Sequence, residues 1–203
     1  MKQFLLLMIL ALVLLMGCQE NILTPFQVND LWGYQDANGN IVIEPQYIFA
    51  EPFSKYGLAL VASLEDGWVF INSQGELVIK PYYLANNNSC DRFSDGLCRY
   101  EENGKIGYFD EKGTIQIKAQ FEYGSAFING YAAVAKDVSF EEVGELTFVR
   151  SNQWGFINKN GQLVIPYQYE AIIEPFNEQG RAVVKKDRRQ IIIDQKGIEL
   201  GEQ

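Results

Sequence analysis

The side chains able to do chemistry in this chain are acids and thiols, because its 203 residues include no histidine. Histidine-based triads, imidazole general bases and histidine-bound zinc are therefore excluded. Two adjacent carboxylate pairs remain, Glu101 with Glu102 and Glu141 with Glu142, and glycosidases work with two acids. Neighbours along a strand point to opposite faces, however, so neither pair would converge on one substrate bond. We therefore expect a protein that is not an enzyme and needs no cofactor.

Residues 36–40, Asp-Ala-Asn-Gly-Asn, space their oxygen ligands as the start of a calcium loop does. No glutamate follows at the distance that such a loop requires, and the same turn recurs in the chain without the extra oxygens. We interpret the segment as a hairpin turn and expect no metal site.

The first cysteine lies at the end of an N-terminal leader. An apolar run over residues 4–16 follows Lys2 and is too short to span a bilayer comfortably, which is typical of an export signal. The next residues, Leu15-Met16-Gly17-Cys18, resemble the lipobox of bacterial lipoproteins. The resemblance implies removal of residues 1–17 and a mature chain that contacts the membrane only through acyl chains, such as palmitate, on Cys18. The alternatives are an uncleaved anchor or ordinary secretion.

Gln19 stands where the aspartate of an inner-membrane retention signal would be. We therefore expect export and anchoring at the outer membrane, on its periplasmic or its surface face. Without the leader the formal charge is 16 − 26 = −10, against −9 for the whole chain. An acidic surface repels phosphate backbones, so we expect no nucleic acid partner.

Two further cysteines, Cys90 and Cys98, are close in sequence. Export would permit a disulfide between them. Cys98, however, takes a strand position that is filled by alanine in related segments, at Ala59, Ala133 and Ala182, so a buried free thiol is the alternative. The sequence leaves both open.

These residues sit in a repeated unit. Five copies begin at Trp32, Trp68, Ile106, Trp154 and Gln190, and each has a glycine seven residues later, at Gly39, Gly75, Gly113, Gly161 and Gly197. Asp or Asn opens each turn, and glycine supplies the positive φ that a bulged hairpin requires. A mainly apolar triplet follows the first four turns, over residues 41–43, 77–79, 115–117 and 163–165. We therefore predict five hairpins.

Each full copy reads as three short strands. The first strands are expected at residues 31–35, 68–72, 105–110 and 154–158, and the third at 57–61, 96–100, 130–134 and 180–184. Proline cannot donate to a ladder, so the second strand should end at its proline or the proline should lie at a sheet edge; these prolines are Pro45, Pro81 and Pro166. No segment after the leader keeps a helical period, so the fold class is all-β.

The pattern of Trp-Gly-aromatic, Asp/Asn-x-x-Gly, an apolar triplet, proline and tyrosine resembles the WG (KWG) repeat family of bacterial proteins. Gly107 and Gly155 carry its glycine, whereas Val69 replaces that glycine in the second copy and Ile106 replaces the tryptophan in the third. The resemblance covers about four and a half units of the mature chain. It implies an exported β-repeat module and brings no catalytic residues.

The repeat aromatics admit two interpretations: a ladder that stacks on carbohydrate, or the core between stacked units. The residues are Trp32, Tyr34, Trp68, Tyr108, Trp154 and Phe156. We favour the core, because Ile106 stands at one of the tryptophan positions and cannot stack on a sugar as tryptophan does.

Residues 137–148 interrupt the regular spacing of the copies, which is 36, 38, 48 and 36 residues. Alternation on both sides of residues 141–145 predicts a protruding hairpin. It is either a place of specific contact or a tolerated insertion.

The predicted organisation is a signal peptide at 1–17, a tether and N-terminal cap strand at 18–30, and the repeat domain at 31–203. Three strands per unit favour an open, solenoid-like array, with a closed, propeller-like ring as the alternative. The expected function is a lipid-anchored envelope module that binds a protein partner through one face of the array. A glycan-binding or carbohydrate-active envelope protein is the alternative.

Overall fold

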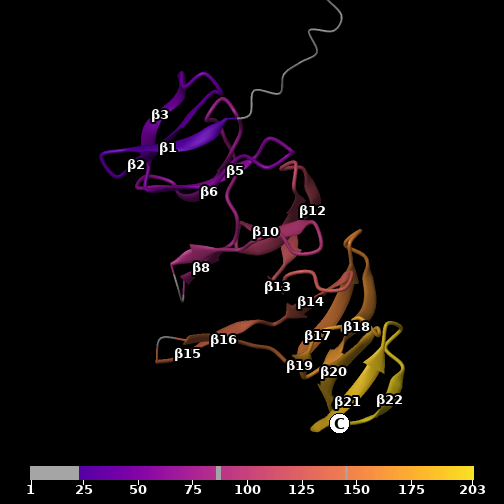
Figure 1. Cartoon of the computed structure of the whole chain (residues 1–203). Helices are drawn as coiled ribbons and strands as arrows, with labels where there is room; N and C mark the ends of the chain where they lie inside the picture. Colours follow the sequence, from indigo (N-terminus) through magenta and orange to yellow (C-terminus); the bar gives the residue numbers. More distant parts are fainter. Residues whose placement is uncertain (1–22, 86–87, 145) are drawn as a thin grey trace, which may run out of the picture.

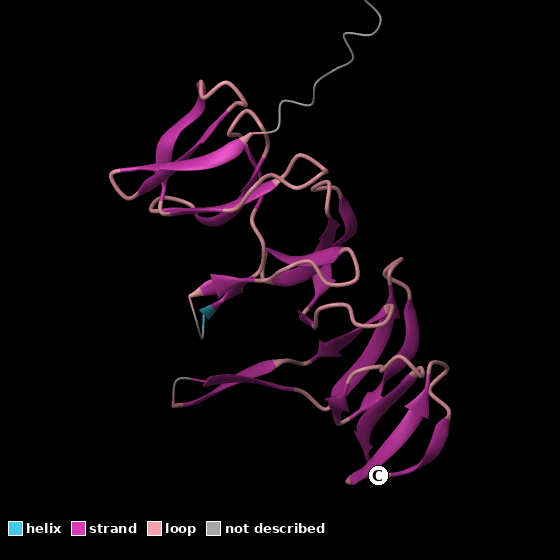
Figure 2. Cartoon of the chain, viewed as in Figure 1, coloured by secondary structure: helices cyan, strands magenta, loops and turns pink. Residues whose placement is uncertain are grey.

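The computed structural model describes residues 23–85, 88–144 and 146–203, and this part of the chain is nearly all β (Figures 1 and 2). Small antiparallel sheets follow one another from the N-terminal to the C-terminal end (Figure 1). No ladder among the described residues joins the first sheet to the last. The array is therefore open, as predicted, and the ring alternative is wrong.

Five sheets form the array, and their strand orders are β1-β2-β3, β4-β5-β6-β7, β10-β11-β12, β13-β14-β17-β18 and β19-β20-β21-β22. The first strands of the repeats are β2 (Leu31–Gln35), β6 (Gly67–Ile71), β11 (Lys105–Asp110), β17 (Gln153–Asn158) and β21 (Arg189–Asp194). The second strands are β3 (Ile41–Tyr47), β7 (Leu77–Ile79), β12 (Ile115–Phe121), β18 (Leu163–Tyr169) and β22 (Glu199–Glu202). All five predicted hairpins are present.

The third strand of each repeat belongs to the sheet of the next repeat. These strands are β5 (Ala59–Ser63), β10 (Leu97–Glu102), β14 (Tyr131–Lys136) and β20 (Arg181–Lys186), and each pairs with the following first strand. The cap strand β1 (Thr24–Val28) pairs with β2 in the same way, as the sequence predicts. Three sheets gain a short extra strand, namely β4 (Phe49–Ala50), β13 (Tyr123–Gly124) and β19 (Ala171–Glu174). Consecutive repeats are thus tied by hydrogen bonds.

The hairpin turns have the predicted chemistry. Asp36 Oδ1 accepts the N–H groups of Asn38 and Asn40 at 2.8 and 2.9 Å, and Gly39 takes a φ of 81°. The same two bonds recur at the residues that open the other turns, Asn72, Asp110, Asn158 and Asp194. Residues 36–40 therefore form the hairpin turn that the sequence predicts.

The prediction that each proline ends the second strand or lies at a sheet edge is confirmed, because β3 and β18 are the last strands of their sheets. Strands β3 and β18 run through Pro45 and Pro166, and only β7 stops before Pro81. The ladder shifts register at the prolines, because Trp32 pairs with Tyr47 while Tyr34 pairs with Ile43. A bulge needs no ladder donor at that point, and proline fits there.

The core consists of layers between successive sheets. The first layer packs Tyr34 and Ile43 of one sheet against Val61, Val69 and Ile71 of the next. Equivalent layers follow at each later sheet boundary. Most of the repeat aromatics lie in these layers, because Tyr34, Tyr108, Trp154 and Phe156 are buried. The core interpretation is confirmed for them, while Trp32 and Trp68 lie at the border of their layers, only partly buried.

Candidate binding surface

The glycine of the Trp-Gly pair is required by the bulge in the second strand. A Cβ on Gly33 would lie 2.4 Å from the carbonyl oxygen of Ile43, and one on Gly155 would lie 2.5 Å from that of Ile165. A Cβ on Gly107 would lie 2.5 to 2.7 Å from the ring of Tyr100 and from backbone atoms of β12. Any residue larger than glycine at this position of the first strand would therefore clash with a bulged second strand.

The second repeat carries Val69 at this position, and its second strand departs from the others. Strand β7 pairs with β6 only at Phe70 and Ile71. The chain then turns away, so that the N–H of Tyr82 donates to the carbonyl of Arg99 at 2.8 Å. The following residues form a separate hairpin, β8 (Tyr83–Leu84) with β9 (Ser89–Cys90).

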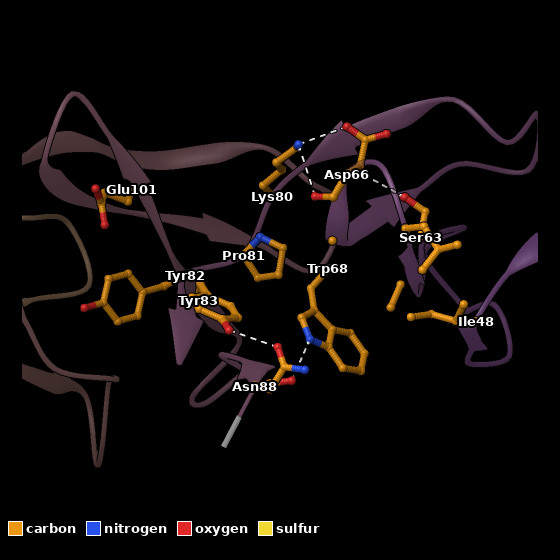
Figure 3. A pocket seen from close by; sticks show the side chains of 13 residues that line it. Ile48, Ser63, Asp66, Trp68, Lys80, Pro81, Tyr82, Tyr83, Asn88 and Glu101 are labelled. Carbon is orange, nitrogen blue, oxygen red and sulfur yellow. Dashed lines mark hydrogen bonds and ion pairs between the residues drawn. The ribbon is translucent and has the colours of Figure 1, made fainter. Parts of the chain in front are cut away.

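This departure leaves Trp68 without its cross-strand aromatic. In the other full repeats the lead residue faces a buried ring, which is Tyr47, Phe121 or Tyr169. Tyr83 is the counterpart in the second repeat, but it pairs with Cys90 and is 53% exposed. Trp68 is left only partly buried and lines a cavity of about 490 Å³ (Figure 3).

Polar contacts fix the walls of this cavity (Figure 3). The indole N–H of Trp68 donates to the carbonyl of Asn88 at 3.1 Å, and the Tyr83 hydroxyl donates to Asn88 Oδ1 at 2.9 Å. Lys80 Nζ lies 2.9 Å from Asp66 Oδ1 on the opposite wall. We call this cavity the Trp68 pocket.

A buried ion pair holds the base of the β8–β9 hairpin. Arg99 donates from Nε and Nη2 to the carboxylate of Asp91 at 2.8 and 3.0 Å, and from Nη1 to the carbonyl of Gly124 at 3.0 Å. Its guanidinium also lies 4.8 Å from the ring centre of Tyr82. Burial lowers the pKa of Arg99, but the hydrogen bond and charge of Asp91 outweigh it and hold that pKa above its ordinary value.

The inserted residues form the predicted hairpin, β15 (Ser139–Val143) with β16 (Leu146–Arg150). It projects from the array on the same side as β8 (Figure 1). The two hairpins enclose a cavity of about 490 Å³, which we call the hairpin cleft; it is lined by Tyr82, Tyr83, Leu84, Ala85, Arg99, Tyr123, Phe140, Thr147 and Val149. Phe140 is 59% exposed. Sequence reasoning proposed contacts for the insertion alone and did not find this cleft.

The ion pair of Asp91 and Arg99 was also missed. The sequence did carry one sign of a buried partner for Arg99. The other repeats hold an apolar residue at the equivalent strand position, namely Leu60, Ala133 and Val183. The equivalence follows from the cross-strand partners, because Arg99 pairs with Tyr108 as these residues pair with Phe70, Phe156 and Ile192. A cation at an apolar repeat position predicts a specific buried partner.

Cys90 and Cys98 are both buried free thiols, and no disulfide joins them. Of the two interpretations that the sequence left open, the buried free thiol describes both residues. Burial raises the pKa of both thiols, that of Cys90 to about 11. The alanine equivalent to Cys98 in the third repeat is Ala132, not Ala133, because Ala132 pairs with Ile157 as Cys98 pairs with Phe109. Cys18, the predicted lipidation site, lies outside the described residues.

The two adjacent carboxylate pairs form no assembled site among the described residues. Glu101 and Glu102 lie on β10, and Glu141 and Glu142 on β15, all four exposed. Glu141 lies 2.5 Å from Arg150 across its own hairpin. Between residues 23 and 203, leaving out the undescribed positions, no three acids or cysteines gather to hold a metal ion. The same part of the chain contains no helix long and apolar enough to cross a membrane.

Comparison with known proteins identifies the repeats. The family described as WG containing repeat matches residues 32–63, 68–105, 106–137 and 154–188. No curated protein matches the chain. Among solved structures, Kluyveromyces lactis Hsv2 aligns over 87% of this chain and 72% of its own, with 10% identity and a TM-score of 0.29. A likeness of that degree supports no argument about function.

Proposed function

Because the chain belongs to the WG containing repeat family, we propose that it is a non-enzymatic module of the bacterial cell envelope that binds a protein partner. Acyl chains on Cys18 tether it to the outer membrane, and the repeat array presents the binding surface. The partner docks in the hairpin cleft between β8–β9 and β15–β16.

One observation carries this proposal: the two hairpins that break the repeat pattern face each other across one cavity. Phe140 and Tyr83 expose more than half of their surfaces there, at 59% and 53%. Aromatic side chains are enriched in the buried centres of protein interfaces, and exposed apolar patches on soluble proteins mark contact sites. The pinned base of β8–β9 holds one wall of the cleft in place and so lowers the cost of ordering it on binding.

The test is affinity capture from the organism's own envelope with the lipidated protein as bait. A partner should co-purify in stoichiometric amount with the wild type and be lost with Phe140→Ser. Ile198→Ser is the matched control, because Ile198 is 56% exposed on the last hairpin and lies outside the cleft. A Cys18→Ala bait reports whether anchoring is needed.

Two outcomes would contradict the proposal. In the first, Phe140→Ser and a deletion of residues 138–146 both retain the partner on a folded protein. In the second, only peptidoglycan or polysaccharide fragments are captured, and the glycan-binding alternative replaces the protein-binding one.

A further inference from the structure

Strand β6 has an open edge at residues 67–69. On the β7 side its ladder stops at Phe70, whereas in the other full repeats the ladder reaches the lead residue. On the other side Trp68 pairs with Ala62, whose carbonyl accepts the N–H of Ile48 at 2.8 Å and so points away from β6. Antiparallel strands alternate the direction of their hydrogen-bonding groups. The N–H and C=O of Trp68 therefore point toward the place of the missing strand.

Cavities lie on both faces of this edge. The Trp68 pocket occupies the face that carries the indole. A second cavity of about 360 Å³ is lined by Val69 on the other face, and the two share Ser63, Leu64 and Asp66. An added strand sends successive side chains to opposite faces, so it would place one in each cavity.

The other repeats indicate which side chain fits the Trp68 pocket. At that place they hold a ring opposite the lead residue, and Tyr47 and Tyr169 are buried there against tryptophans. In the second repeat the equivalent aromatic is Tyr83, which lies on β8 and pairs with Cys90 instead of Trp68. A ring supplied by another chain would restore the same pair with Trp68.

The second cavity indicates the neighbouring side chain. Its lining includes the carboxylates of Glu65 and Asp66 and no basic residue. Lys80, which directly follows β7, forms an ion pair with Asp66, but both side chains are about half exposed, at 53% and 45%. Exposed ion pairs contribute little, so an incoming strand can displace this one. Glu65 is exposed and makes no ion pair with any described residue, which favours a basic side chain.

We propose that the open edge of β6 binds an extended segment of a partner protein as an added strand, with an aromatic side chain on Trp68 and the adjacent, basic side chain beside Glu65. The inference rests on the proposed function for the class of its ligand, a protein, and adds a second site and a recognition mode. The backbone of the segment takes the ladder positions that β7 leaves empty.

The probe is a capped hexapeptide, Thr-Val-Lys-Tyr-Thr-Val, added to the full-length protein during amide hydrogen exchange measured by NMR. At saturation the Trp68 amide should exchange at least about tenfold more slowly, because it gains a ladder partner. Alanine in place of the tyrosine should weaken binding about tenfold. A backbone N-methyl group on the peptide, which removes a ladder donor, should abolish the protection.

Glu65→Lys should weaken binding of the same peptide, whereas Glu178→Lys should not. Both carboxylates are exposed on turns and both changes alter the charge equally, but residue 178 lies far from the edge in sequence and lines neither cavity. Equal losses with the two variants would reduce the effect to non-specific charge attraction and overturn the inference.

Unchanged exchange at Trp68, or undiminished binding of the N-methylated peptide, would also overturn it. So would a perturbation of Trp68 by soluble peptidoglycan fragments in the absence of any effect of the peptide. The capture experiment separates the inference from the proposed function. If Phe140→Ser abolishes partner capture while Trp68→Ala and Glu65→Lys both leave it intact, the inference is wrong and the proposed function stands.

Discussion

Replacing Arg99 with leucine should destabilise the second and third repeats more than any surface change of similar size. The variant leaves the carboxylate of Asp91, which is 7% exposed, without its cation and without two hydrogen bonds of 2.8 and 3.0 Å. It also leaves the carbonyl of Gly124 without its 3.0 Å donor. Removing one partner of a buried pair costs about 3–5 kcal/mol. Arg99→Leu should therefore lower the free energy of unfolding by that amount.

The double variant Asp91→Leu with Arg99→Leu separates the charge from the packing. Leucine is the residue that the first repeat holds at the equivalent strand position, Leu60, where it is 1% exposed. Replacing a whole buried ion pair by apolar residues is often neutral. The double variant should therefore be at least about 2 kcal/mol more stable than Arg99→Leu alone.

Urea denaturation followed by tryptophan fluorescence measures these differences. Repeat arrays can unfold in parts, so amide exchange at Tyr82 and Asp91 gives the local reading. Their N–H groups donate to the carbonyls of Arg99 and Tyr82, both at 2.8 Å, and should lose protection in the single variant. A single variant as stable as wild type, or a double variant no better than the single, would refute the reasoning.

Three further predictions concern the repeat core. Gly155→Val should cost about 2–4 kcal/mol in urea denaturation, because its Cβ would lie 2.5 Å from a backbone oxygen of Ile165 and force β18 away from β17; a loss below about 0.5 kcal/mol would contradict the role given to the bulge. Tyr108→Phe should cost about 1–2 kcal/mol by the same assay, because it leaves the carbonyl of Ser125 without a 2.8 Å hydrogen bond in the core. Alkaline conditions should destabilise the protein: the pKa of Cys90 is raised from 9.0 to about 11, so the unfolded chain loses this proton first and stability falls as pH rises through that interval. Cys90→Ala should flatten this part of a plot of unfolding free energy against pH, and a slope unchanged by that variant would assign it to other groups.

The sequence predicts the fold well where one residue type determines local geometry. Asp or Asn followed three residues later by glycine predicted the five repeat turns, and the conformations of their glycines agree. Strand positions followed from apolar periods, and the pairing of β15 with β16 followed from alternation on either side of residues 141–145. These features depend on neighbours in sequence, which a single chain displays.

The features that the sequence left open depend on contacts between segments distant in sequence. Pro45 and Pro166 lie within edge strands and do not end them, because a bulge opposite Gly33 and Gly155 removes the need for a proline donor. Whether Cys90 and Cys98 pair was also left open, and in the structure both are free thiols buried in a packed layer. The hairpin cleft forms between the β8–β9 hairpin and the inserted β15–β16 hairpin. The sequence of neither hairpin indicates that the other lies beside it.

The departures from the repeat pattern are better guides to binding than the repeat itself. The array explains many of the regular positions: buried tyrosines fill layers, glycines admit bulges, and the Asp or Asn side chain that opens each turn accepts hydrogen bonds from nearby backbone. Val69 also packs in a layer, but Val69, Arg99 and the insertion all depart from the repeat pattern, and all three lie in the second and third repeats. Val69 excludes the bulge and frees Tyr83, Arg99 pins the hairpin that carries Tyr83, and the insertion supplies Phe140 across the cleft. Three separate changes that build one surface support the proposed contact, because a tolerated insertion alone would not involve Val69 and Arg99.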